Sequence, residues 1–188
     1  MTTETLARKL GTTPHLSPLL MKARRLGLRG VDELCALAVQ RGCRYYDLAN
    51  ESGVLREEPV LRMSSSASPT RELTNEELSI ALLSICQPHS QHGIRVGAAM
   101  LGAEGNSASR CASLAIRERC EVVVRHVAEC GKKVEPENGF WSDLLALLPE
   151  TSPAPMDLLP HPTRFVAMTG YTRKGKGVVM QWIRPSAA

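Results

Sequence analysis

Residues 74–88, which read TNEELSIALLSICQP, decide the fold. The first four form a capping box, in which the hydroxyl of Thr74 accepts from the amide of Glu77 and the carboxylate of Glu77 reaches back to the amide of Thr74. Pro88 ends the helix, because proline has no amide to continue the ladder. Between these signals the apolar residues recur at helical spacing, at Leu78, Ala81, Leu82 and Ile85. The stretch therefore predicts an amphipathic helix.

Helical patterns continue on both sides of this stretch. Upstream, Ser17 and Pro18 supply a hydroxyl cap and a proline at the first helical position. Gly27 ends that helix, and Gly42 closes a second one over 31–40. Downstream, helices are predicted over 91–101, over 107–130 and over 141–148. The stretch 107–130 is predicted as one long helix, with an apolar stripe of Ala112, Ile116, Cys120, Val123, Val127 and Cys130. These patterns predict a mainly α fold, a bundle of about four helices with an N-terminal helical segment.

Composition agrees with helix packing. Hydrophobic residues make up 43% of the 188 residues, enough for a sizeable core, whereas aromatic residues make up only 4%. The core must therefore consist mainly of Leu, Val, Ala, Met and Cys. In the helix over 91–101 the small residues Gly97 and Ala98 predict close approach of a neighbouring helix. The longest apolar stretch, 78–86, is too short to cross a bilayer.

The pattern changes after residue 150. Four prolines within 151–162 exclude a helix and indicate an extended connector. Alternating residues over 165–171 and 178–183 then flank the loop Arg173-Lys174-Gly175-Lys176-Gly177, which predicts a C-terminal β-hairpin with a basic tip. The predicted organisation is a basic helical segment (1–48), a serine-rich flexible linker (49–73), the helical bundle core (74–150), the connector (151–162), and the basic hairpin and tail (163–188).

The net charge of +4 is unevenly distributed. Residues 1–50 carry eight Lys/Arg against four Asp/Glu, residues 51–162 carry ten against fifteen, and residues 163–188 carry five against none. Both ends are therefore basic around an acidic middle, which points to an anionic partner. The alternative is that the basic ends attract the acidic middle or stay solvated.

Nucleic acid is the anionic partner that these residues favour. Cations beside glycines can approach phosphates closely, and a neighbouring ring can stack on a base. The predicted contacts are Arg173, Lys174, Lys176 and Tyr171 in the hairpin, with Arg8, Lys9, Arg24 and Arg25 as a second patch. The alternative for the hairpin is a plain solvated turn, with Trp182 anchoring it to the body.

A zinc site is a separate possibility. Cys86, His89 and His92 place a thiol and two imidazoles within seven residues, and both are good zinc ligands. His126 and Cys130 could complete the site. The alternative is that the cysteines are buried and the histidines solvated. Six cysteines without a Cys-x-x-Cys pattern indicate reduced, mostly buried thiols in a cytoplasmic protein. Beyond zinc, no cofactor is expected.

Enzyme motifs do not stand out in this sequence. It contains no Gly-x-Ser-x-Gly, no phosphate-binding loop ending in Gly-Lys-Ser/Thr, and no His-Glu-x-x-His. The carboxylates of the predicted long helix, Glu118, Glu121 and Glu129, are expected on its solvated side, paired with Arg117 and Arg125. The sequence thus predicts a non-enzymatic intracellular module that contacts nucleic acid. The alternatives are a protein-interaction or structural subunit of a larger assembly, with a protein partner or a second copy of the chain bound to it, and a metal-dependent enzyme or zinc-stabilised domain.

Overall fold

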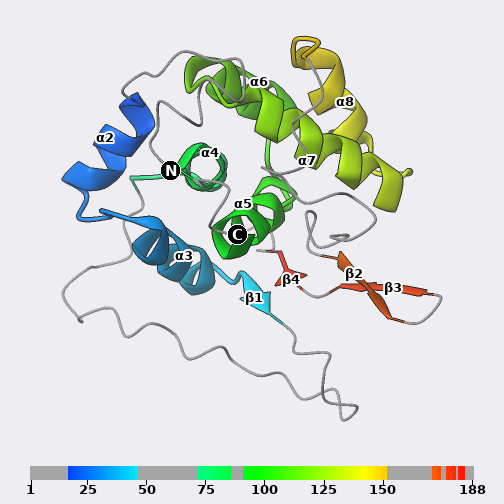
Figure 1. The fold of residues 1–188 in the computed structure, drawn as a ribbon, viewed down its shortest axis with the longest axis horizontal. Helices are drawn as coiled ribbons and strands as arrows, with labels where there is room; N and C mark the ends of the chain where they lie inside the picture. The colour runs from blue at the N-terminus through cyan, green and yellow to red at the C-terminus, as the bar shows by residue number, and fades with distance from the viewer. Residues whose placement is uncertain are drawn as a thin grey trace.

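A computed structural model gives the fold and describes residues 17–45, 72–85, 91–151, 171–174, 177–180 and 182–184. Over these residues the chain is mainly helical, as predicted (Figure 1). The helices are α2 (Pro18–Arg25), α3 (Val31–Gln40), α4 (Asn75–Ile85), α5 (Gln91–Leu101), α6 (Ala108–Arg117), α7 (Glu121–Val134) and α8 (Gly139–Leu147). Within the described part of the chain, no helix has the length and apolar character needed to span a membrane.

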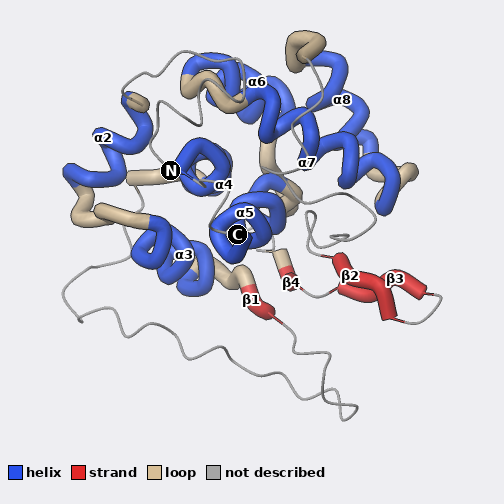
Figure 2. Tube along the Cα trace, in the orientation of Figure 1, coloured by secondary structure: helices blue, strands red, loops and turns tan. Residues whose placement is uncertain are grey.

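Helix α4 lies at the centre of the helical body, where it contacts α5, α2, α3, α6 and α7 (Figures 1 and 2). Its capping box is present as predicted: the Thr74 hydroxyl accepts from the Glu77 amide at 3.2 Å, and Glu77 accepts from the Thr74 amide at 3.0 Å. Helix α5 packs closely on α4, because a Cβ atom at Gly97 would lie only 3.0 Å from Cβ of Leu82. The close approach that the small residues of α5 predict is therefore confirmed.

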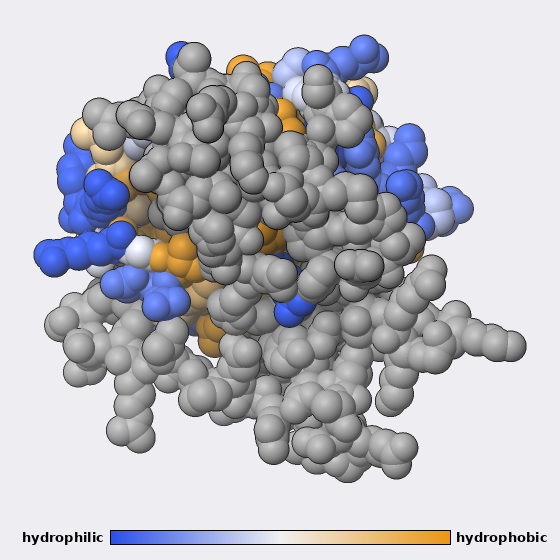
Figure 3. Space-filling view, in the orientation of Figure 1, coloured by the Kyte–Doolittle hydropathy of each residue, from blue (hydrophilic) through white to orange (hydrophobic). Residues whose placement is uncertain are grey.

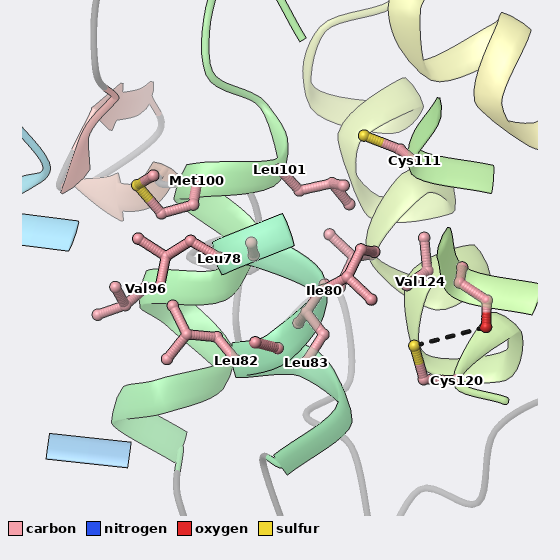
Figure 4. Packing of buried hydrophobic residues seen from close by; sticks show 14 of the residues in the cluster. Leu78, Ile80, Leu82, Leu83, Val96, Met100, Leu101, Cys111, Cys120 and Val124 are labelled. Carbon is pink, nitrogen blue, oxygen red and sulfur yellow. Dashed lines mark hydrogen bonds between the residues drawn. The ribbon is translucent and has the colours of Figure 1, made fainter. Parts of the chain in front are cut away.

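One hydrophobic core joins all seven described helices. Figure 4 shows its centre, where Leu78 and Leu82 of α4 meet Val96 and Met100 of α5. Aliphatic and cysteine side chains fill most of this core, and the ring of Trp141 is fully buried in it. Leu19, Ala23, Leu34 and Cys35 belong to the same cluster, so α2 and α3 pack on the bundle.

The single long helix predicted over 107–130 is wrong, because the structure divides it into α6 and α7. The break lies at Arg119, whose φ of 55° is in the left-handed region. The amide of Arg119 donates to the carbonyl of Ile116 at 3.1 Å, and the amide of Cys120 donates to the carbonyl of Ala115 at 3.0 Å. This pair of bonds is a Schellman motif, which ends a helix. The helical body over 72–151 consequently has five helices rather than about four.

The same motif ends α2 and α3. There, Gly27 and Gly42 take positive φ angles of 85° and 99°, as the sequence predicts for glycines at these ends. The following residues, Leu28 and Cys43, bury their side chains and donate their amides to an alanine carbonyl near the end of the helix. Two of the three helix ends can be predicted from the sequence, because glycine occupies the position with positive φ. The third cannot, because arginine occupies that position.

Four short strands complete the described structure. β2 (Tyr171–Lys174) pairs antiparallel with β3 (Gly177–Met180), and β1 (Arg44–Tyr45) pairs antiparallel with β4 (Trp182–Ile183). Trp182 and Ile183 therefore pair with the segment after α3 instead of extending the predicted hairpin. Arg173 and Lys174 lie in β2 rather than in its loop. The hairpin over 163–188 with a basic tip stays a prediction, because residues 163–170 and 175–176 lie outside the described residues. Residues 49–71 of the predicted linker (49–73) and residues 152–162 of the proline-rich connector also lie outside the described residues.

Candidate functional site

Helix α2 presents its cations to solvent because its apolar residues are turned inward. Ser17 caps the helix by accepting from the Leu20 amide at 3.1 Å, and Pro18 takes the first helical position. Leu19 and Ala23, one turn apart, are buried. Arg24 and Arg25 are exposed, as is Arg29 in the segment that follows. No acidic residue occurs between residues 17 and 30, so this segment is uniformly basic.

The N-terminus of α2 is held by a carboxylate that lies far away in sequence. Glu118, at the C-cap of α6, accepts from the hydroxyl of Ser17 at 2.5 Å and from the amide of Leu19 at 3.3 Å. Only 1% of Glu118 is exposed, so the expectation that it lies on a solvated helix face is wrong. A negative charge at a helix N-terminus is favourable, because the first amides there lack helical partners. Glu118 thus fixes α2 against α6.

A second contact fixes the middle of α2. Lys22 donates to both carboxylate oxygens of Glu77, at 3.0 and 2.8 Å. Burial by itself raises the pKa of Glu77, but the hydrogen bonds from Lys22 and from the Thr74 amide, together with the charges of Lys22 and Arg110, outweigh burial and lower that pKa overall. Glu77 therefore stays ionised at neutral pH and binds α2 to α4.

Helix α6 adds cations beside the start of α2. Arg117 and Arg119 flank Glu118 in sequence, and both are exposed. Arg117 donates its Nε to Glu118 at 3.0 Å while 53% of its side chain remains exposed. We call the cations that these two helices and their following turns present to solvent the α2–α6 basic surface; its members are the exposed Arg24, Arg25, Arg29, Arg110, Arg117 and Arg119 and the half-buried Lys22.

The carboxylates that touch this surface point away from solvent. The side chains of Glu77 and Glu118 are 12% and 0% exposed, so their cationic partners carry the outward charge. Figure 3 shows hydrophilic side chains gathered at the left edge of the molecule, where Figure 1 places α2. Asp32 and Glu33, in the first turn of α3, border the surface on one side.

The structure describes only some of the cations that the sequence predicts to contact nucleic acid. Of the second patch, Arg24 and Arg25 are exposed on α2. Arg8 and Lys9 lie outside the described residues, as does Lys176 of the hairpin. Tyr171, Arg173 and Lys174 lie on β2, where the structure describes the backbone pairing alone. Their contact with nucleic acid stays a prediction.

Sequence reasoning missed the arginines of α6 as members of a surface. Within the predicted long helix, Arg117, Glu118 and Arg119 look like an ordinary solvated face. Three charged residues between Ile116 and Cys120 are also what a continuous amphipathic helix carries, so no local signal marks the helix end at Arg119.

The proposed zinc ligands are not brought together by the described residues. Cys86 and His89 lie outside them, and His92 lies in α5 without a described side chain. Cys130 is in the hydrophobic core, 1% exposed. Over the part of the chain that the structure describes, no group of three or more metal-ligating side chains occurs. A site built on Cys86, His89 and His92 stays a prediction.

The described cysteines are core residues. All five are buried, as predicted: Cys35, Cys43, Cys111, Cys120 and Cys130. Burial raises the pKa of Cys43 to about 12, assisted by the nearby Cys35, and raises those of Cys111 and Cys130 to about 12 as well. Thiols in this state are protonated at neutral pH and make poor nucleophiles.

No protein-family model, curated protein or solved structure matches this chain. The chemistry of the α2–α6 basic surface is therefore the basis on which a function can be argued.

Proposed function

We propose that this protein is a non-enzymatic module that binds nucleic acid through the α2–α6 basic surface, with the basic residues of β2 as a further contact. The observation that carries the proposal is the exposure of Arg24, Arg25 and Arg29 on a segment without acidic residues. Guanidinium groups pair with phosphates through two parallel hydrogen bonds, which favours a polyanion as the partner.

The rigidity of the surface supports binding rather than loose counter-ion attraction. Glu118 holds the start of α2, and Glu77 holds its middle. Because these contacts fix α2 against α4 and α6, the backbone that carries the cations needs little ordering when a ligand binds. Phosphate contacts of this kind position a ligand without reading its sequence. The expected binding is therefore dominated by charge and sensitive to salt.

The test is fluorescence anisotropy with short single-stranded DNA, duplex DNA and RNA at two salt concentrations. The double variant R24A/R25A removes two cations of the surface, and K132A/K133A removes two exposed lysines from the far end of α7 as a matched control. We expect R24A/R25A to weaken binding and to reduce the salt slope by about two, since each phosphate contact contributes about 0.9 to that slope. An equal loss in both double variants would show that net charge alone drives binding.

A protein partner is the second candidate, and one observation favours it. Met21 on α2 and Ile116 on α6 are 50% and 48% exposed, so large apolar side chains accompany the cations on the same two helices. Apolar side chains within a charged rim are typical of protein interfaces. Light scattering coupled to size-exclusion chromatography tests for self-association, and the variant M21S/I116S should abolish any dimer while leaving nucleic-acid binding nearly unchanged.

A further inference from the structure

The end of the described chain is held by one arginine. Nη1 of Arg184 donates to Oε2 of Glu135 at 3.0 Å and lies 2.8 Å from Oε1 in an ion pair. Glu135 is the C-cap of α7, and the two side chains are only 13% and 14% exposed. One of the five cations that make residues 163–188 basic is therefore committed to an ion pair inside the molecule.

An indole completes the surroundings of this guanidinium. The ring of Trp141, in α8, lies with its centroid 5.7 Å from Cζ of Arg184, within the range of a cation–π contact. Nε1 of Trp141 donates to Oε2 of Glu135 at 2.5 Å, and Nδ2 of Asn138 donates to the same oxygen at 3.3 Å. Glu135 thus orients the ring and binds the arginine at the same time.

Two glycines make the space for this arrangement. A Cβ atom at Gly102, just after α5, would lie 2.9 Å from Cζ of Arg184. A Cβ atom at Gly131, in α7, would lie 2.4 Å from Cδ2 of Trp141. Gly102 therefore leaves room for the guanidinium, and Gly131 leaves room for the indole beside it. The other groups around the guanidinium are a carboxylate and an aromatic ring, which suit a planar guanidinium better than an ammonium.

The guanidinium beside Glu135 and Trp141 belongs to the C-terminal part of the chain and not to the helical bundle. Arg184 directly follows β4, which pairs with β1 and contacts α5. β1 in turn follows α3. Arg184 thereby connects β4 to α7 and α8. The pairing of β4 with β1 connects the same segment to the end of α3.

We propose that Glu135, Asn138, Trp141, Gly102 and Gly131 form a guanidinium-binding site that Arg184 occupies as an internal ligand, latching β4 onto the helical bundle. This proposal is independent of nucleic-acid binding. The ligand class is an arginine side chain or another alkylguanidinium. Emptying the site releases the C-terminal strand, and a free alkylguanidinium refills it.

The first test refills the emptied site. The chain has two tryptophans, so W182F leaves Trp141 as the one fluorophore of this kind. In the full chain carrying W182F and R184A, we expect ethylguanidinium to cause a saturable change in Trp141 fluorescence at millimolar concentration. Ethylammonium should cause none, and the W182F chain with Arg184 intact should not respond. An absent response, or the same response in the intact chain, overturns the proposal.

The second test measures release of the strand. Without a charge-assisted hydrogen bond, opening of the segment should become about ten to a hundred times more frequent. Cleavage of the C-terminal segment by proteinase K should accelerate accordingly in R184A but not in R173A, a matched arginine of β2. Circular dichroism checks folding. If R184A fails to fold, E135Q carries the test, and unchanged cleavage there overturns the latch.

Discussion

The long-range cap of α2 gives the sharpest test of how this fold is held together. Replacing Glu118 by alanine removes the acceptor for the Ser17 hydroxyl and the Leu19 amide, both of which are buried. A buried donor left without a partner costs about 1–3 kcal/mol, so the two together cost about 2–6 kcal/mol. Part of this cost is offset, because a buried carboxylate no longer has to be desolvated, so we expect a net loss of about 2–4 kcal/mol in the free energy of unfolding.

The assay is urea denaturation followed by circular dichroism, with thermal unfolding alongside it. For a chain of this size, 1 kcal/mol shifts Tm by about 2–4 °C, so a loss of about 2–4 kcal/mol in E118A should lower Tm by roughly 4–16 °C. E118Q keeps one acceptor and should fall between E118A and the wild type. E129A is the matched control: Glu129 is 50% exposed and pairs with Arg125 at 3.4 Å, so its loss should cost about 0.5 kcal/mol or less.

Hydrogen exchange locates the effect in the molecule. In E118A, the amides at the start of α2 should exchange faster, whereas those of α4 and α5 should change only with global stability. Equal unfolding free energies for E118A and E129A would refute the reasoning, since they would mean that Glu118 contributes no more than an exposed carboxylate. Unchanged exchange in α2 would refute it as well.

Three further changes test other parts of the fold. G131A should destabilise by about 1–3 kcal/mol in urea, because its Cβ would collide with the indole of α8, whereas G139A, where nothing lies within 4 Å, should be neutral or slightly stabilising. R119G should raise the free energy of unfolding measured in urea by about 0.5–1 kcal/mol, since glycine adopts a φ of 55° without strain; a destabilised R119G would contradict the Schellman assignment. Glu77 has a folded pKa below its usual 4.5, so its stabilising contribution is present above that pH and is lost as pH falls through the folded pKa. Stability measured from neutral pH to about pH 3 should therefore fall less steeply for E77Q than for the wild type, and parallel curves would contradict the assigned role of Lys22 as its partner.

Local signals predict most of the helices. The capping box at Thr74, the Ser17-Pro18 start and the glycine ends at Gly27 and Gly42 all act within a few residues, so they can be recognised before any tertiary contact is known. The bounds predicted for α3 and α5 agree with the structure for the same reason. The helix end at Arg119 could not be predicted, because arginine is rarely found at positive φ and nothing local distinguishes it.

For the candidate sites too, the sequence predicts local features but not the contacts between residues far apart in the chain. The sequence predicts that Arg24 and Arg25 are exposed, because they lie opposite the apolar positions of an amphipathic helix. It cannot predict that Glu118 is buried against α2, since the two are separated by about a hundred residues. It also cannot predict that Arg184 meets Glu135 and Trp141, because that contact depends on where the C-terminal strand returns to the bundle.

The sequence alone therefore determined the helical class, the positions of most helices, the aliphatic core and the basic character of the two ends. The tertiary structure decided which charges face solvent and which are neutralised inside. Helix formation depends on contacts within one or two turns, so the local order of the residues is enough to predict it. A charge at the surface is free or paired according to what the folded chain brings beside it, and that partner can come from anywhere in the sequence.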